Sequence, residues 1–409
     1  MLNKIWGGFF LVAFVAAMGR WLLLGESEIW KALVEAAFAM AKTGFEIALG
    51  LTAVMCLWLG VMRLGEKGGA VDLLARGFGP LLRRLFPGIP EGHPAMGSIV
   101  MNMAANMLGL DNAATPLGLK AMKELQTLNP EPDRATDEQV LFLVVNTSAV
   151  TLIPVTIFVY REQLGAADPT DIFLPILIAT FCSTMVGLLA TAMIQKIKLL
   201  DPVVMAYLGG LTALVAGMVV YFSGLERDVM ERQSSLVSNF LIFGVIVFFL
   251  GLAAFRRQPV YETFVEGAKD GFQVAIGIIP YLVAMLVAIG VFRASGALDF
   301  LLDGVRLGAE RLGLDTRWVD GLPTAVMKPL SGSGARGLMI ETMETHGADS
   351  FAGRLASVIQ GSTETTFYVL AVYFGSVGIR RTRHAVGCGL AADAAGIIAA
   401  IFVSYLFFG

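Results

Sequence analysis

Residues 41–51 read Ala-Lys-Thr-Gly-Phe-Glu-Ile-Ala-Leu-Gly-Leu, and residues 268–278 repeat the pattern as Ala-Lys-Asp-Gly-Phe-Gln-Val-Ala-Ile-Gly-Ile. Six of the eleven positions are identical, at an offset of 227 residues. The same offset pairs Gly69, Ala70 and Asp72 with Gly296, Ala297 and Asp299. Because the register holds without a gap across both segments, the sequence predicts an internal duplication.

Both copies lie in a chain that is too apolar for an ordinary soluble protein. Of its 409 residues, 56% are hydrophobic and 15% are charged, whereas soluble domains average about 25% charged residues. A transmembrane helix needs about 20 mostly apolar residues, because its backbone must bond within the segment. Nine stretches meet this requirement: 5–24, 44–62, 139–160, 172–195, 202–223, 236–255, 271–292, 355–379 and 385–408. An all-α polytopic membrane protein is therefore predicted.

The segment 94–128 does not read as a full span. The run from Pro94 to Leu110 is short for a crossing and contains Asn102 and Asn106. With residues 113–128 it is predicted to form a re-entrant hairpin, and the tip of a second hairpin is predicted at Lys328–Arg336. The segments 67–86 and 294–314 mix apolar and charged residues, which favours amphipathic helices at the membrane interface, although ordinary loops are the alternative.

The number of spans decides how the two copies are related. Five full spans separate their starts, and an odd number of crossings reverses the direction of the chain. The prediction is therefore two inverted-topology repeats, with about nine full transmembrane helices, two re-entrant hairpins and interfacial helices. The halves are assigned to residues 1–200 and 201–409.

Basic residues predict the orientation. Arginines and lysines at 63–84, 196–198, 256–257 and 380–383 favour a cytoplasmic N-terminus in the cell (inner) membrane. The exception is the segment 293–317, whose arginines would face outside. This exception is expected if the segment is an inverted copy of the basic segment 63–84. The expected partners are the lipid bilayer and a small-molecule solute. No basic tract indicates nucleic acid, and a homo-oligomer is left open.

Polar motifs interrupt both halves, and polar groups in hydrocarbon indicate function by default. Asn102 and Asn106 share a helix face at i, i+4, and Pro116 suits the first turn of a helix whose N–H groups could bind a ligand. Further polar breaks fall in the next span of each half. The candidate solute-binding residues are Asn102, Asn106, Asn112, Thr115, Asn146, Thr147, Ser148, Lys328, Ser331, Ser333, Arg336, Ser362, Thr363 and Thr365. Polar contacts that only hold helices together are the alternative.

Two carboxylates fall inside predicted spans. Glu364 and Asp393 are costly in lipid if ionised, so each is predicted either to pair with a cation such as Lys328 or Arg336 or to take up protons. We assign both to coupling with H⁺ or Na⁺. The motif Gly332-x-Gly334-x-x-Gly337 matches a dinucleotide fingerprint, but no predicted strand surrounds it. Its glycines are instead expected to let backbone approach a ligand closely.

Signatures of enzymes are missing from the sequence. There are three histidines and three cysteines, without metal-ligand spacing, and neither a P-loop nor a GxSxG elbow occurs. We therefore expect no enzyme, no metal site and no cofactor beyond the coupling ion.

The motif from Asn102 to Gly118 resembles the hallmark of spore maturation protein A. The segments Lys328–Gly337 and Gln360–Thr366 resemble spore maturation protein B, so nearly the whole chain is similar to a fusion of the two. That family belongs to the nucleoside-recognition or Gate group, which includes membrane parts of concentrative nucleoside transporters and of bacterial ferrous-iron transporters. The resemblance implies transport, without implying a particular solute.

The leading hypothesis is a secondary transporter for a small polar or anionic metabolite, nucleosides included, with one central site between the inverted repeats. Both hairpin tips are expected to face each other there, with Lys328 or Arg336 balancing substrate charge. A non-transporting membrane scaffold or regulator and a passive channel are the alternatives.

Overall fold

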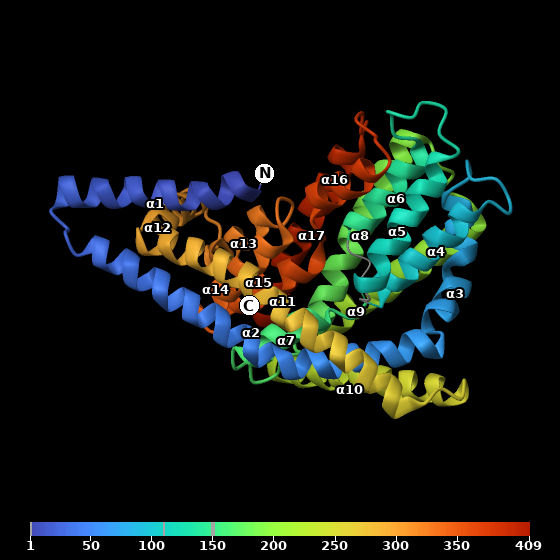
Figure 1. Cartoon of the computed structure of the whole chain (residues 1–409), viewed down its shortest axis with the longest axis horizontal. Coiled ribbons are helices and arrows are strands. Elements are labelled where there is room, and N and C mark those ends of the chain that lie inside the picture. The colour runs from blue at the N-terminus through green and yellow to red at the C-terminus, as the bar shows by residue number, and fades with distance from the viewer. Residues whose placement is uncertain (1, 109–110, 149–151) are drawn as a thin grey trace. The chain divides into compact units, whose positions relative to one another are not determined.

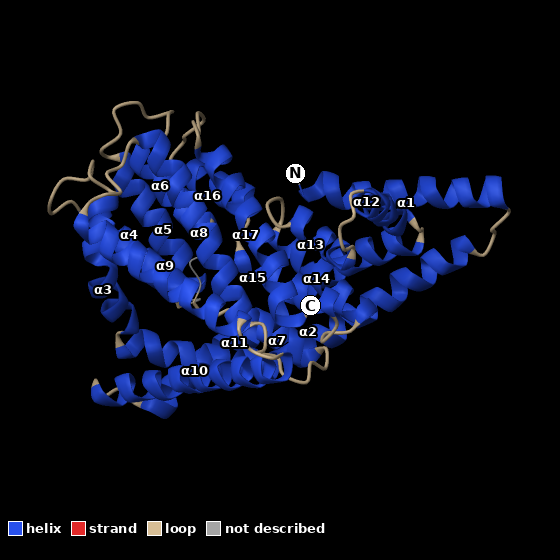
Figure 2. Cartoon of the chain, turned by 180° about the vertical axis from the view of Figure 1, so that it is seen from behind, coloured by secondary structure: helices blue, strands red, loops and turns tan. Residues whose placement is uncertain are grey.

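The computed structural model describes residues 2–108, 111–148 and 152–409. Throughout these residues the regular elements are helices and no strand occurs, as Figure 2 shows. Helices are the expected result for apolar segments that must satisfy their own backbone hydrogen bonds. The all-α prediction is thus confirmed for the described part of the chain.

Two compact units divide the chain, and each takes segments from both halves of the sequence. The first unit comprises 1–58, 156–169 and 268–360, and the second comprises 59–155, 170–267 and 361–409. The helices lying wholly or mostly in the first unit are α1 (Leu2–Leu24), α2 (Ile29–Gly68), α7 (Val155–Gln163), α11 (Val260–Ala294), α12 (Ala297–Arg311), η1 (Arg317–Gly321), α13 (Leu322–Met327), α14 (Gly332–His346) and α15 (Phe351–Ser362). Figure 1 labels the α-helices among them. Those of the second unit are α3 (Ala70–Leu85), α4 (Pro94–Met107), α5 (Asp111–Gln126), α6 (Asp137–Thr147), α8 (Phe173–Gln195), α9 (Pro202–Ser223), α10 (Arg227–Phe255), α16 (Thr366–Ser376) and α17 (Ala385–Phe408).

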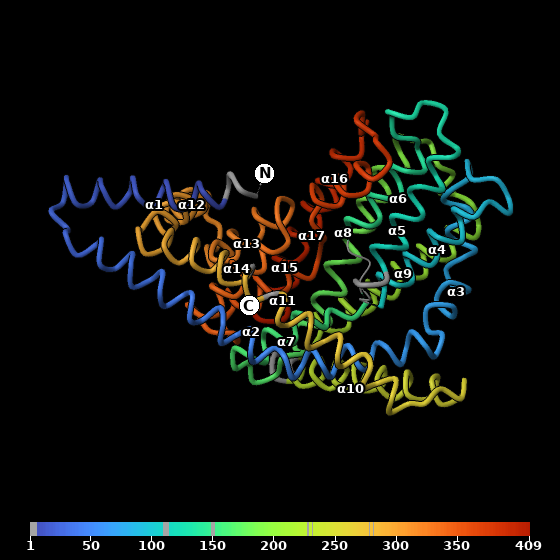
Figure 3. The backbone as a smooth tube through the Cα atoms, in the orientation of Figure 1, coloured from blue at the N-terminus to red at the C-terminus, as the bar shows by residue number. Residues whose placement is uncertain are grey.

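Seven helices of the described residues are long and apolar enough to cross a membrane. They contain seven of the nine predicted spans. The other two, 139–160 and 355–379, are each interrupted: α6 and α7 share the first, and α15 and α16 share the second. Figure 3 traces α15 and α16 on either side of the second interruption. Both interruptions fall at the polar residues that the sequence places inside apolar runs, where side chains compete for backbone hydrogen bonds.

Helices α2 and α11 carry the two copies of the repeated stretch, and they pack through its glycines. A Cβ added at Gly44 would lie 3.1 Å from Cα of Val283, and one added at Gly271 would lie 2.8 Å from Cα of Cys56. Gly44 and Gly271 correspond at the offset of 227, and so do Cys56 and Val283. Each contact is therefore the twofold image of the other, as inverted repeats require.

Glycines in a left-handed conformation begin the two amphipathic helices. Gly69 precedes α3 with φ 82°, and Gly296 precedes α12 with φ 81°. This conformation is open to glycine at little cost, so the repeat conserves the same turn in both copies. Both segments predicted to be amphipathic are helices, while their position at the membrane interface stays a prediction.

Large apolar side chains remain exposed on several long helices, for example Leu23 on α1, Val220 on α9 and Phe255 at the end of α10. Exposed apolar surface of this extent is unusual for a protein in water. It is expected where lipid replaces water around the chain.

Candidate functional site

Three asparagine amides of the second unit form a hydrogen-bonded chain. Asn102, fully buried on α4, donates through Nδ2 to the carbonyl of Ala114 on α5, at 2.7 Å. Asn106 donates to Oδ1 of Asn146 at 2.8 Å and to Oδ1 of Asn102 at 3.3 Å. Asn146 in turn donates to the carbonyl of Phe142 at 2.8 Å. The amides therefore tie α4 to α5 and to the end of α6.

Helices α4 and α5 form the hairpin that the sequence predicts. His93 accepts from the backbone N–H of Ala95 and caps α4, with Pro94 in its first turn, a position that suits proline. Thr115 is exposed on α5. The side chain of Asn112 and residues 109–110 lie outside the described residues. Re-entry of this hairpin into the membrane stays a prediction.

The two helix breaks meet in the second unit. Helix α6 starts with a capping box between Thr136 and Gln139 and ends at Thr147, where the hydroxyls of Thr147 and Ser148 bond back to backbone carbonyls three residues earlier. The backbone N–H of Glu364, inside the second break, donates to the carbonyl of Thr147 at 2.8 Å. The C-terminal end of α6 is thereby joined to the gap between α15 and α16.

Helix α8 donates hydrogen bonds to both breaks, although none of the predicted site residues lies on it. Thr180 Oγ1 donates to the carbonyl of Gly361 at 3.2 Å, and Thr184 Oγ1 donates to the carbonyl of Ser148 at 3.2 Å. The signal that could have found α8 is its row of small and hydroxyl residues at helical spacing, namely Thr180, Ser183, Thr184, Gly187 and Thr191.

The two acidic candidates have different surroundings. Asp393 on α17 is 1% exposed, and its Oδ2 accepts a hydrogen bond of 2.7 Å from the Thr366 hydroxyl. The side chain of Glu364 is exposed. Ser362, Thr363 and Thr365 of the second break are buried. Asp393 is therefore the carboxylate enclosed by the polar breaks.

The Lys328–Arg336 motif lies in the first unit. Ser331 caps α14 by accepting from the N–H of Gly334 at 3.0 Å, and its hydroxyl is 3.3 Å from that of Ser333. Lys328 is 3% exposed, and the Arg336 guanidinium lies over the ring of Tyr160 at 5.7 Å. Unit 2 thus brings together the asparagines, both breaks and Asp393, while the convergence of this motif with them stays a prediction.

Glycines of this motif contact protein instead of open space. A Cβ at Gly334 would lie 2.9 Å from Cγ of Met327, and one at Gly337 would lie 3.2 Å from side-chain atoms of Met285 and Ile289. They let α14 pack closely against α13 and α11. A ligand approaching the backbone at these two glycines, as the sequence predicts, would meet the side chains of Met327, Met285 and Ile289.

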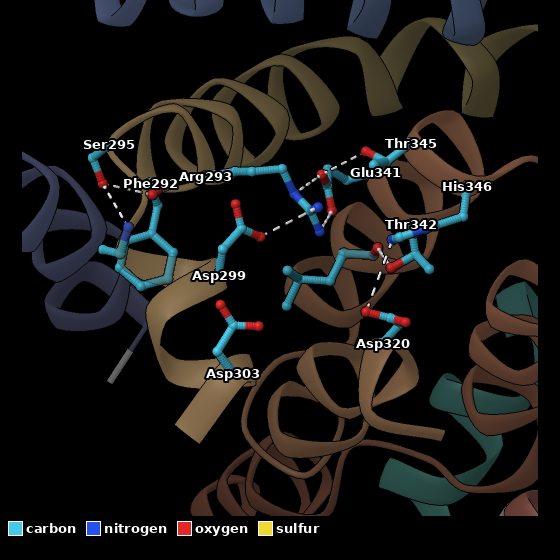
Figure 4. A network of polar contacts seen from close by, with 12 residues as sticks. Phe292, Arg293, Ser295, Asp299, Asp303, Asp320, Glu341, Thr342, Thr345 and His346 are labelled. Carbon is cyan, nitrogen blue, oxygen red and sulfur yellow. Dashed lines mark hydrogen bonds and ion pairs between the residues drawn. The ribbon is translucent and has the colours of Figure 1, made fainter. Parts of the chain in front are cut away.

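The first unit also contains a network of charged residues that the sequence pattern does not indicate (Figure 4). Arg293 donates to buried Glu341 at 3.0 Å and lies 3.7 Å from Asp299. Arg306 pairs with Asp303 at 2.7 Å and also with Asp320. Arg293 and Arg306, two of the arginines that contradict the positive-inside pattern, are thus paired with carboxylates. Within the described residues, no group of three or more His, Cys, Asp and Glu is placed to hold a metal ion.

Comparison with known proteins gives one family and two relatives. The sequence profile of the Gate family, described as nucleoside recognition, matches residues 48–164 and 275–380. Spore maturation protein B of Bacillus subtilis (strain 168) is 46% identical over 174 residues, which are 42% of this chain and 91% of that protein. Spore maturation protein A of the same strain is 41% identical over 183 residues, 45% of this chain and 90% of that protein. No solved structure matches significantly.

Proposed function

The chain belongs to the nucleoside-recognition (Gate) family, and from this premise we propose that it is a secondary membrane transporter for a small polar or anionic metabolite. Nucleosides are the first candidates, because the family is described by their recognition. The two relatives are named for spore maturation. In spore-forming hosts, such transport would serve that process.

The meeting of the two helix breaks is the observation that carries the proposal. In a membrane, two interrupted helices would expose backbone groups, and this is tolerated where those groups are buried in protein or line a polar cavity. In the second unit the Glu364 N–H and the Thr147 carbonyl join the breaks at 2.8 Å. Broken helices that meet in this way coordinate solutes and ions in many secondary transporters built from inverted repeats.

The candidate residues divide into three roles in this proposal. Lys328 or Arg336 would balance a negative charge on the solute. The asparagine chain and the serine and threonine hydroxyls would fix the solute's orientation, and Glu364 or Asp393 would couple its movement to H⁺ or Na⁺.

Uptake by proteoliposomes tests the proposal. Radiolabelled uridine, adenosine, lactate and succinate would be offered with and without Na⁺ or proton gradients. We expect saturable, gradient-dependent uptake of one class, reduced at least tenfold by Lys328→Met. The matched control is Lys31→Met, which removes an exposed lysine whose partner is Glu35. Gradient-independent, non-saturating flux would indicate a passive channel.

A second candidate is a non-transporting membrane scaffold, and the asparagine chain favours it. The amide N–H groups of Asn102, Asn106 and Asn146 all donate within the protein, as expected of contacts that hold helices together. This candidate predicts that Asn106→Ala lowers the unfolding temperature and that the folded wild type moves none of the four solutes. Such a result would refute the transporter proposal.

A further inference from the structure

Helices α8 and α17 approach each other closely beside the second break. A Cβ added at Gly187 of α8 would lie 3.0 Å from Cβ of Ala392, and one added at Gly396 of α17 would lie 3.0 Å from Cβ of Ser183. The numbering runs in opposite directions along these two contacts, so the helices are antiparallel. Ser183 therefore faces the turn of α17 that carries Asp393 and Gly396.

The residues of the break lie against the same turn of α17. A Cβ at Gly396 would lie 3.2 Å from the carbonyl oxygen of Ser362, and it would overlap the methyl group of Thr363. Asp393 stands three residues before Gly396, on the same helix face, and accepts from the Thr366 hydroxyl at 2.7 Å. A carboxylate, hydroxyls and a backbone carbonyl thus share one small region.

Two of these hydroxyls could form hydrogen bonds but have no partner for one among the described residues. Ser183 is fully buried and Thr363 is 1% exposed. Across the described residues, neither hydroxyl oxygen makes a hydrogen bond. A buried polar atom is normally hydrogen-bonded or bound to something else, so these two hydroxyls indicate that a ligand binds here.

The electrostatic character of this region favours a cation. Helix α6 ends at Thr147 and α15 ends at Ser362, and the C-terminal end of a helix carries partial negative charge. Both ends lie here, because the Thr147 carbonyl bonds to Glu364 and the Gly361 carbonyl bonds to Thr180. The carboxylate of Asp393 adds a full negative charge when ionised.

We propose that Asp393, Thr363, Ser183 and the carbonyl oxygen of Ser362 bind one sodium ion. One carboxylate with neutral oxygens balances a single positive charge, and hard oxygen ligands suit a hard cation. The close approach of α17 to the break favours a small ion. The proposal deepens the proposed function by naming the coupling ion, so its coupling role rests on that function, whereas the binding site itself does not.

The test is sodium binding to the purified full-length protein in detergent, without any solute. Binding of ²²Na⁺ and the unfolding temperature would be measured in NaCl and in choline chloride at constant ionic strength. We expect saturable ²²Na⁺ binding and an unfolding temperature that rises with NaCl concentration, because a ligand of the native state stabilises it. Asp393→Asn should abolish both effects.

Weaker variants keep the test decisive if Asp393→Asn fails to fold. Ser183→Ala and Thr363→Val should each weaken sodium binding at least tenfold. The matched control is Thr191→Val, on the same helix as Ser183, since the Thr191 hydroxyl bonds to the carbonyl of Gly187 in its own helix at 2.8 Å. It should leave the affinity for sodium unchanged.

Several outcomes would overturn the site. These are equal stability in sodium, potassium and choline, unchanged ²²Na⁺ binding in Ser183→Ala and Thr363→Val, or a response to pH alone, which would indicate a proton in place of sodium. Failure of the proposed function looks different, since sodium would then bind as expected while no solute moves into proteoliposomes.

Discussion

At the scale of single residues, His384 shows how one side chain can make the fold sensitive to pH. It precedes α17, and its Nε2 lies 3.0 Å from Nε2 of Gln195 at the end of α8. The same Gln195 nitrogen donates to the carbonyl of Asp137 at 2.8 Å, which identifies it as the amide N–H. The imidazole Nε2 must therefore accept, as only a neutral histidine can. Burial, with a smaller contribution from Arg383, lowers the pKa of His384 below its usual 6.5.

This arrangement predicts a loss of stability in mild acid. A histidine whose pKa is lower in the folded state takes up its proton more readily when unfolded, so stability is complete above pH 6.5 and falls as the pH drops toward the folded-state pKa. Protonation would also place two N–H groups of His384 and Gln195 against each other. The unfolding temperature of the detergent-purified protein should therefore decrease from pH 7 to about pH 5, and His384→Gln should reduce this decrease. An identical pH profile in the variant would contradict the assignment.

At the scale of helices, the repeated glycines divide into two kinds. Gly44 and Gly271 contact the opposite helix in both copies, whereas Gly50 faces the side chain of Gln163 and its counterpart Gly277 has no atom within 4 Å of an added Cβ. The sequence treats Gly271 and Gly277 alike, since both are identical between the copies. The packing of α2 on α11 separates them.

Alanine substitution at these two positions should therefore have opposite effects. In Gly271→Ala the new Cβ would lie 2.6 Å from the carbonyl oxygen of Met55, and backbone atoms cannot rotate away, so we expect a loss of about 1–3 kcal/mol. Gly277→Ala meets no such contact and should be neutral or stabilising by up to about 1 kcal/mol, because alanine favours helix. Unfolding temperatures measured side by side would decide, and an equal effect of both changes would contradict the reciprocal packing.

The elements differ in how far the sequence could predict them. Apolar runs predicted the long helices, and polar residues inside such runs predicted both interruptions. Both predictions were possible because neither pattern depends on contacts between distant residues. The role of α8 was not predictable, since in the sequence Thr180 and Thr184 look the same whether their hydroxyls bond within the helix or across to a break. Arg161 is a similar case: an arginine at the end of a span usually reaches water, yet this one is fully buried and pairs with Asp349 at 3.1 Å.

At the scale of the whole chain, two ion pairs connect the broken helices reciprocally. In the first unit Arg161, near the end of α7, pairs with Asp349 in the loop before α15. In the second unit Arg381, after α16, pairs with Asp133 in the loop before α6 at 2.7 Å, and its hydrogen bond lowers the pKa of Asp133. Each pair joins the end of one broken helix to the start of the other, which is the relation that an inverted repeat generates.

These pairs also agree with the orientation that we propose from the positive charges. In this threading the chain starts in the cytoplasm, and every long or broken helix crosses the membrane while the hairpins do not. Loops 127–136 and 377–384 then lie on the cytoplasmic side. The loops 164–172 and 347–350 then lie outside. Each ion pair thus connects two loops assigned to the same side, and contacts between loops on opposite sides would have ruled the threading out.

Cysteine labelling tests this threading. In a variant whose three native cysteines are replaced by alanine, single cysteines would be placed at Ala167, Leu314, Glu131 and Arg257. A membrane-impermeant maleimide should label Ala167→Cys and Leu314→Cys in intact spheroplasts, and Glu131→Cys and Arg257→Cys only after permeabilisation. The reverse pattern would show either that the N-terminus lies outside or that residues 94–128 cross the membrane. A further cysteine at exposed Ser27, in the loop between α1 and α2, separates these two explanations. Labelling of Ser27→Cys together with Glu131→Cys would show that residues 94–128 cross the membrane fully, because that crossing shifts every later loop to the other side, and the inverted relation of the two repeats would then fail.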